Sequence, residues 1–193
     1  MSWLDTLLGR SKPVAPDLDA LFALPSAAVG LEAALGLRPT GSGAVCIKPV
    51  EGAEFARTQA EVTALLRVDG GSAVEEVRDA YGYLWTTCSA APDQLADLVT
   101  ALHGANSSYQ QAGFGPGLLC SVVGFAGEID GSARRIGLVY LYKRGSFYPF
   151  APTGPEVRDT ALEFQLRGAL AGDLKVEPDL ARWFPVWGAP GLS

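Results

Sequence analysis

Few side chains of this 193-residue chain belong to the types that perform catalysis or hold a metal ion. His103 is the sole histidine, and the three cysteines, Cys46, Cys88 and Cys120, stand far apart in apolar runs. A metal site needs thiolates or imidazoles at short spacings, and a catalytic histidine needs a nucleophile and an orienting acid beside it. Because neither arrangement is present, we expect no catalytic residue, no metal site and no cofactor. We interpret His103 as packing on the exposed side of a helix.

A glycine-rich run, Gly113-Phe-Gly-Pro-Gly117, has the composition of a phosphate-binding loop. A Walker loop leads from a strand into a helix and carries a lysine at its end, whereas these glycines lead from a predicted helix into a predicted strand. We therefore interpret the run as a helix end and a turn. Carboxylates are frequent, and two that converge in the fold would form an acid–base pair. A small-ligand site or an unrecognised enzyme stays open as an alternative function.

One segment combines positive charge with aromatic rings. Residues 140–152 read Tyr-Leu-Tyr-Lys-Arg-Gly-Ser-Phe-Tyr-Pro-Phe-Ala-Pro, and the tail repeats the combination in Arg-Trp-Phe-Pro-Val-Trp at 182–187. Exposed aromatic rings beside arginine are typical of protein interfaces, although the same rings would also form a second buried layer. We predict partner binding, with burial of the rings as the alternative, for Lys143, Arg144, Phe147, Tyr148, Phe150, Trp183 and Trp187.

The first twelve residues form a short amphipathic segment. Trp3, Leu4, Leu7 and Leu8 fall on one stripe at helical spacing, and the linker Pro-Val-Ala-Pro at 13–16 separates the segment from the body of the chain. We expect this stripe to contact a protein partner or a membrane surface, and docking in a groove of the chain's own body is a further alternative. A segment this short binds a membrane only weakly by itself.

The composition is that of a globular protein. Hydrophobic residues make up 48% of the chain and charged residues 19%, which is incompatible with extended disorder. A net charge of −6 with scattered lysines and arginines argues against binding to nucleic acid, which needs a basic stripe. We find no signal peptide and no unbroken apolar run of spanning length, and we read the cysteines as reduced thiols. These features predict a cytoplasmic protein, with the inner face of the cell membrane as the alternative location.

Hydrophobic periodicity predicts one α+β domain over residues 17–193, ending in a tail rich in tryptophan and proline. Predicted helices and strands follow in the order α, β, α, ββ, α, ββ, α. Short polar turns join the paired strands, so we expect an antiparallel sheet of about five strands with helices packed mainly on one face. The predicted helices cover residues 17–36, 51–67, 92–113 and 153–170, and the predicted strands cover residues 44–48, 74–78, 83–88, 118–125 and 136–142.

Five blocks of the chain resemble an actinobacterial family of PspA-associated proteins called PspAB. They are residues 2–10, 18–27, 113–120, 140–152 and 182–192. The resemblance implies an accessory protein of the phage-shock, or envelope-stress, system built around the membrane-remodelling coat protein PspA. It also implies an HtpX-like membrane protease as a second candidate partner, and it carries no catalytic residues over to this chain.

The order of elements is also similar to that of type III secretion chaperones and YbjN-like domains. Such a likeness concerns the fold and says little about function. It implies a sheet that binds a helix or an extended peptide, often in a homodimer. We therefore expect a non-enzymatic adaptor that binds a PspA-like partner through its sheet edge and the aromatic, cationic strip. The alternatives are a small-ligand binder or enzyme, and a peripheral membrane protein anchored by residues 1–12.

Overall fold

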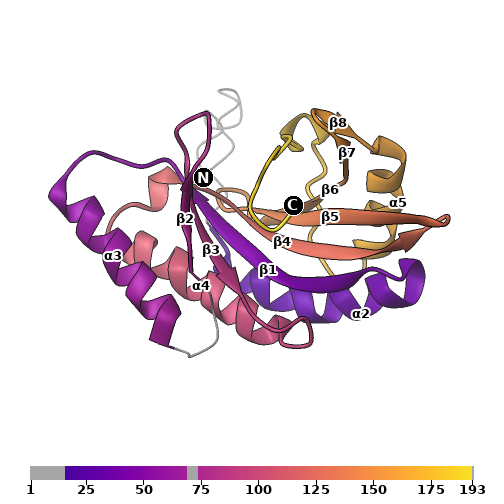
Figure 1. Cartoon of the computed structure of the whole chain (residues 1–193), viewed down its shortest axis with the longest axis horizontal. Helices are drawn as coiled ribbons and strands as arrows, with labels where there is room; N and C mark the ends of the chain where they lie inside the picture. The colour runs from indigo at the N-terminus through magenta and orange to yellow at the C-terminus, as the bar shows by residue number, and fades with distance from the viewer. Residues whose placement is uncertain (1–15, 69–73, 193) are drawn as a thin grey trace, which may run out of the picture.

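The structure, a computed structural model, describes residues 16–68 and 74–192 (Figure 1). The amphipathic stripe of Trp3, Leu4, Leu7 and Leu8 lies outside the described residues. Within them the fold is α+β, as the sequence predicts, with four α-helices and a six-stranded sheet. The helices are α2 (Leu24–Leu35), α3 (Ala53–Val68), α4 (Leu95–Gln111) and α5 (Thr160–Leu170), and a 3-10 helix, η1 (Leu18–Ala23), runs directly into α2.

The sheet has the strand order β2-β3-β1-β4-β5-β6, and every pair in it is antiparallel. Several strand boundaries differ from the prediction. Residues 38–43, which lie before the predicted strand 44–48, belong to β1, which has a register shift between Pro39 and Gly43. Strand β4 continues to residue 129 and β5 begins at residue 132, so both extend into the predicted turn between them. The aromatic run after Gly145 adds a sixth strand. The strands are β1 (Arg38–Ile47), β2 (Glu76–Arg78), β3 (Leu84–Ser89), β4 (Leu118–Ile129), β5 (Ser132–Leu141) and β6 (Ser146–Phe150).

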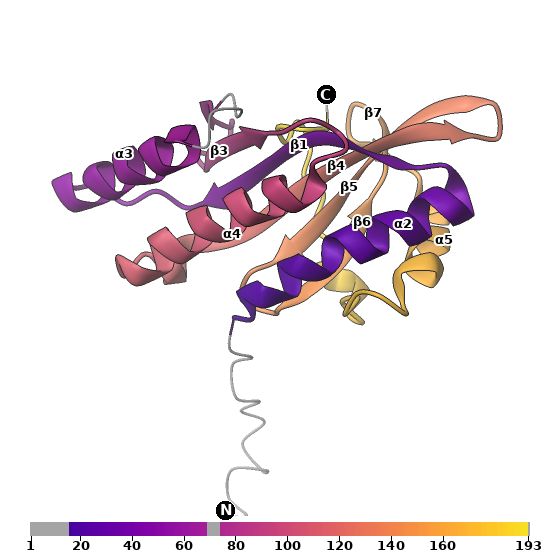
Figure 2. The same cartoon turned by 90° about the horizontal axis from the view of Figure 1, so that it is seen from below.

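Helices cover one face of the sheet, which is the arrangement that the sequence predicts (Figure 2). Successive side chains of a strand point to opposite faces, so Val45 and Ile47 of β1 join the helix-side core while Ala44 and Cys46 point the other way. The helix-side core takes Leu98 and other apolar residues from one side of α4. It is the larger of the two apolar clusters.

The C-terminal segment, residues 183–192, covers part of the other face (Figure 1). It crosses β4 and β5 at Gly124 and Gly137, which are register partners. A Cβ atom on Gly124 would lie 2.6 Å from Thr40 Oγ1 and closer still to the main-chain oxygen of Gly191, and one on Gly137 would lie 2.9 Å from the Leu192 side chain. The two glycines therefore create the shallow surface on which the segment packs.

Two buried carboxylates hold the last third of the chain in place. Glu163 in α5 is fully buried and accepts hydrogen bonds from Arg158 and from the main-chain N–H of Ala151. Glu177, 1% exposed, accepts from the Ser146 hydroxyl at 2.6 Å and from Arg144 at 3.2 Å. Glu163 thus joins α5 to the segment that follows β6, and Glu177 joins the chain after α5 to the turn between β5 and β6 and to the start of β6.

The final helix begins later than the sequence predicts. The run Thr-Gly-Pro-Glu at residues 153–156 has the form of a capping box but does not begin the helix. Residues 152–158 instead form a small antiparallel pair, β7 (Pro152–Gly154) and β8 (Val157–Arg158). The true cap is Asp159, whose carboxylate accepts a 3.0 Å hydrogen bond from the N–H of Leu162. A side chain that accepts from the first free N–H groups of a helix stabilises its start.

One helical stretch, Leu18–Leu35, is long and apolar enough to cross a membrane by length and composition. It is not an unbroken apolar run, since it contains Asp19 and Glu32. Its leucines include Leu24 and Leu31, each 1% exposed within the helix-side core. Core helices of globular proteins and signal sequences near an N-terminus pass the same test, and 33% of this stretch is buried.

Candidate functional site

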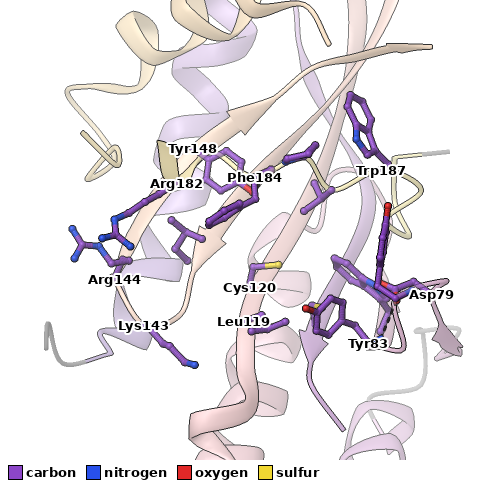
Figure 3. Close-up of a pocket in the computed structure, with 16 residues that line it drawn as sticks. Asp79, Tyr83, Leu119, Cys120, Lys143, Arg144, Tyr148, Arg182, Phe184 and Trp187 are labelled. Atoms are coloured by element: carbon purple, nitrogen blue, oxygen red, sulfur yellow. Dashed lines mark hydrogen bonds between the residues drawn. The ribbon is translucent and has the colours of Figure 1, made fainter. Parts of the chain in front are cut away.

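A pocket of about 460 Å³ opens on the sheet face that the C-terminal segment covers in part (Figure 3). We call it the tail-side pocket. Three segments that are distant in sequence surround it: residues 79–85 from the β2–β3 hairpin, residues 141–148 from the β5–β6 hairpin, and residues 182–187 from the tail. Its floor comes from β1, β4 and β5 and consists of Cys46, Leu119, Cys120 and Leu141.

The hairpin wall is organised by Asp79. One carboxylate oxygen accepts hydrogen bonds of 2.9 Å from the N–H groups of Tyr81 and Tyr83, and the other accepts one of 2.9 Å from Trp85 Nε1. Both oxygens are thus used to shape the turn, which is the usual task of an aspartate at the start of a turn. The ring of Tyr81 is left 73% exposed at the mouth of the pocket.

The tail wall is held by aromatic contacts and two hydrogen bonds. Trp183 is buried, stacks on Tyr148 at 5.9 Å between ring centroids, and donates from its indole N–H to the Glu177 main-chain oxygen at 3.0 Å. The Tyr148 hydroxyl donates to the main-chain oxygen of Phe184 at 2.7 Å. These contacts fix the wall while the ring of Phe184 itself stays 58% exposed.

Three cations stand together on one side of the pocket, across from Asp79 (Figure 3). Arg144 pairs with buried Glu177, and Arg182 pairs with Asp179 at 3.1 Å. Lys143 is exposed and forms no ion pair with the described residues. The pocket therefore offers an apolar and aromatic interior with positive charge at one side.

Two thiols lie on the floor. Cys46 and Cys120 are register partners on β1 and β4, and the hydrogen bond to Cys120, followed by burial, raises the pKa of the Cys46 thiol. The third thiol, Cys88, belongs to the helix-side core, where burial raises its pKa to about 12.

Four of the seven predicted partner-binding residues line the tail-side pocket: Lys143, Arg144, Tyr148 and Trp187. The prediction of an exposed aromatic ledge is wrong for Phe147, Tyr148, Phe150 and Trp183, which are between 0% and 6% exposed. Residues 146–150 form a strand whose two faces are both covered, one by the helix side and the other by the tail, and the rings form the second buried layer that we kept as the alternative.

Sequence reasoning missed other residues of the site. Tyr81 and Phe184 are the exposed aromatic residues at its mouth, and Asp79 and Arg182 also line it. The run Asp79-Ala-Tyr-Gly82 was a visible signal, since an aromatic residue at the tip of a predicted hairpin turn has little core to join. Phe184, between Trp183 and Pro185, gives no signal that distinguishes it from its buried neighbour.

This arrangement suits binding better than proton transfer. The carboxylate of Asp79 is fully occupied by the hairpin, and burial raises the pKa of the Tyr148 hydroxyl. An apolar group would bury its surface against the floor and the two exposed rings. An anionic group beside it would meet Lys143 and the two arginines.

Comparison with known proteins yields one family. A family model described as PspAB, PspA associated protein B, matches residues 1–191. No curated protein and no solved structure matches the chain significantly. Because the matched region extends over nearly the whole sequence, the chain belongs to the PspAB family of PspA associated proteins.

Proposed function

We propose that this protein is a non-enzymatic, cytoplasmic accessory of a PspA-type envelope-stress system, and that it binds a protein partner through the tail-side pocket. The family description links the chain to PspA at a coarse level and so supports an accessory role. The partner and the binding surface are our proposal.

The observation that carries the proposal is the composition of the pocket mouth. Two exposed aromatic rings, Tyr81 and Phe184, flank an apolar floor, and three cations stand beside them. Aromatic residues and arginine around a concave apolar surface dominate binding energy at protein interfaces. A partner of matching chemistry presents an apolar side chain or two, followed by a carboxylate that reaches Lys143.

The sheet edge at β6 is less suited to partner binding than the sequence suggested. A partner strand needs free N–H and C=O groups along an edge. Here residues 175–177 of the same chain already pair with β6. The N–H of Phe147 donates to the Lys175 oxygen at 2.9 Å, and the N–H of Glu177 donates to the Phe147 oxygen at 2.7 Å. The opposite edge strand, β2, is three residues long and offers few groups for pairing. The pocket is therefore the better candidate surface.

The test is direct binding between the full chain and the purified PspA-like protein of the same organism, measured by calorimetry. We expect the Phe184→Ala change to weaken binding by at least about five-fold, or roughly 1 kcal/mol, because it removes an aromatic anchor. Lys143→Glu weakens binding too, since it places a like charge against an acidic partner group. Phe22→Ala is the matched control, because Phe22 is also an exposed ring, 49% accessible, but lies in η1 on the helix side.

Separate arms of the assay address other partners. In one arm, a soluble part of the HtpX-like protease replaces the PspA-like protein. In a second arm, sedimentation tests for a homodimer. In a third, liposome flotation of the chain with and without residues 1–12 tests for a membrane anchor. Binding of the PspA-like protein by the unmodified chain, together with weaker binding by the pocket variants Phe184→Ala and Lys143→Glu, supports the proposal. Absence of binding by the unmodified chain, or equal binding by all three variants, overturns it.

A small-ligand binder is the second candidate, because one observation favours it. The pocket volume of about 460 Å³ falls within the range of roughly 300–1,000 Å³ that ligand pockets span. Native mass spectrometry of the protein isolated from its own organism would detect a retained molecule. A bound mass that the Trp187→Ala variant fails to retain would favour this candidate over the partner-binding one.

A further inference from the structure

Cys46 and Cys120 form a pair of thiols on the floor of the tail-side pocket. They are register partners on the adjacent strands β1 and β4. Both belong to the smaller of the two apolar clusters, on the sheet face that the C-terminal segment covers in part. Cys46 is 2% exposed and Cys120 is 7% exposed, and both line the pocket. The partner-binding role proposed above uses the mouth and the cations of this pocket and assigns nothing to the two sulfur atoms.

The register brings the two sulfurs within reach of a covalent bond. Directly opposed residues of antiparallel strands have Cα atoms about 4.5 or 5.5 Å apart, and disulfides form across Cα separations of about 4.4–6.8 Å. Side chains at opposed positions point to the same face of a sheet, and here that face is the pocket. Both side chains belong to the same buried apolar cluster, so the two sulfurs share one site on the pocket floor.

We infer that Cys46 and Cys120 are a site of oxidative modification, at which hydrogen peroxide converts the two thiols into a cross-strand disulfide. The thiolate of Cys120, the more exposed of the two, attacks a peroxide oxygen; the O–O bond breaks, Cys120 becomes a sulfenic acid, and the other oxygen takes up a proton and leaves as water. The sulfur of Cys46 then attacks the Cys120 sulfur. The S–S bond forms, and the sulfenic oxygen departs with a proton as a second water.

The electrons and atoms of this sequence balance. Two thiols lose two electrons and two protons, and one peroxide molecule is reduced to two water molecules. The oxidant is small and neutral, so neither the cations nor Asp79 at the pocket lining repels it.

Cys88 provides an internal control within the same chain. It is 1% exposed, lies in the helix-side core and does not line the pocket. Its register partner on β1 is Gly43, so no second thiol lies opposite it. The same oxidant should therefore leave Cys88 unchanged in the folded protein.

The experiment treats the reduced full chain with hydrogen peroxide, removes the oxidant, unfolds the protein and counts free thiols with a maleimide. We expect the count to fall from three to one, the mass of the monomer to fall by two hydrogen atoms, and proteolytic mapping to link Cys46 to Cys120. A thiol reductant restores all three thiols. The Cys88→Ala variant should show the same mass loss with no free thiol left, and Cys120→Ala should form no disulfide within the chain.

Three results would overturn the inference: a count that stays at three, a disulfide that includes Cys88 or joins two chains, or oxygen addition to Cys120 with no link to Cys46. Mapping of the unmodified chain and of Cys88→Ala decides the matter even if Cys120→Ala fails to fold. None of these readouts involves a partner, so the outcome is independent of the proposed function.

Discussion

The hydroxyl of Tyr148 in β6 donates a 2.7 Å hydrogen bond to the main-chain oxygen of Phe184, 36 residues later in the sequence. This bond joins the buried edge strand β6 to the wall of the tail-side pocket. The rings of Tyr148 and Trp183 stack beside it. The exposed ring of Phe184 therefore stands on a wall that the core itself positions.

Replacing Tyr148 by phenylalanine removes this bond and keeps the ring. We expect the free energy of unfolding to fall by about 0.5–1.5 kcal/mol, the usual net value of one hydrogen bond. Urea unfolding measures the change. Tyr81→Phe is the matched control, because its ring is 73% exposed; it should change stability by less than about 0.5 kcal/mol. Equal effects of the two changes would contradict the role assigned to Tyr148.

A methyl group on Gly124 should displace the C-terminal segment. Its Cβ would meet the main-chain oxygen of Gly191 and Thr40 Oγ1, and relief of such overpacking costs about 1–3 kcal/mol. Limited digestion with trypsin at Arg182 reports the displacement as faster cleavage of Gly124→Ala. The control is Gly168→Ala in α5, where a Cβ would meet nothing within 4 Å; it should be neutral or stabilising by about 0.5–1 kcal/mol. Unchanged cleavage of Gly124→Ala would mean that the segment does not depend on this contact.

Arg158→Met should be among the most damaging single substitutions of a charged residue. Its guanidinium pairs with the fully buried carboxylate of Glu163 at 2.7 Å and donates to the Trp183 oxygen at 2.8 Å. Loss of one partner leaves a charge buried without compensation, which costs about 3–5 kcal/mol. Arg57→Met, whose pair with Glu61 is exposed, should cost less than about 0.5 kcal/mol in the same thermal or urea unfolding experiment. Similar losses for both variants would show that the Arg158 pair contributes no more than a surface pair.

The helices and most strands were predictable because their side chains repeat at the period of the element. Residues 95–111 of α4 fall within the predicted 92–113, since apolar residues recur there at helical spacing. The strand β6 was missed because Pro149 interrupts it. Proline lacks an N–H and is usually excluded from strands, but it is tolerated near a sheet edge, and β6 pairs in the sheet only with β5.

The pocket was not predictable, because its walls come from segments that meet only in the folded chain. Composition alone found four of the residues that line it: Lys143, Arg144, Tyr148 and Trp187. It could not show that β6 would bury Phe147 and Phe150, because that depends on a strand pairing and on the tail that covers it. The contact between Cys46 and Cys120 depends on the register of β1 against β4. No local pattern encodes that register.

Glu177 should make the stability of the protein depend on pH in the acidic range. Burial alone would raise the pKa of its carboxyl, but hydrogen bonds from the Ser146 hydroxyl, from Arg144 and from the N–H of Asp179 outweigh burial and lower the pKa below its ordinary value of 4.5. A carboxyl whose pKa is lower in the folded state stabilises the fold fully above its unfolded pKa. That stabilisation is lost as the pH falls through the folded pKa.

Glu177→Gln tests this dependence. At neutral pH we expect the variant to be less stable by about 1–3 kcal/mol, because hydrogen bonds to a charged acceptor are replaced by weaker ones. Below about pH 4.5 the difference between the two proteins should shrink, since protonation removes the same charge from the unmodified chain. Urea unfolding at steps between about pH 7 and pH 3 measures the difference, with Glu61→Gln on the exposed face of α3 as the control. A difference that stays constant across this range would show that the Glu177 carboxylate is not bound more strongly in the folded state.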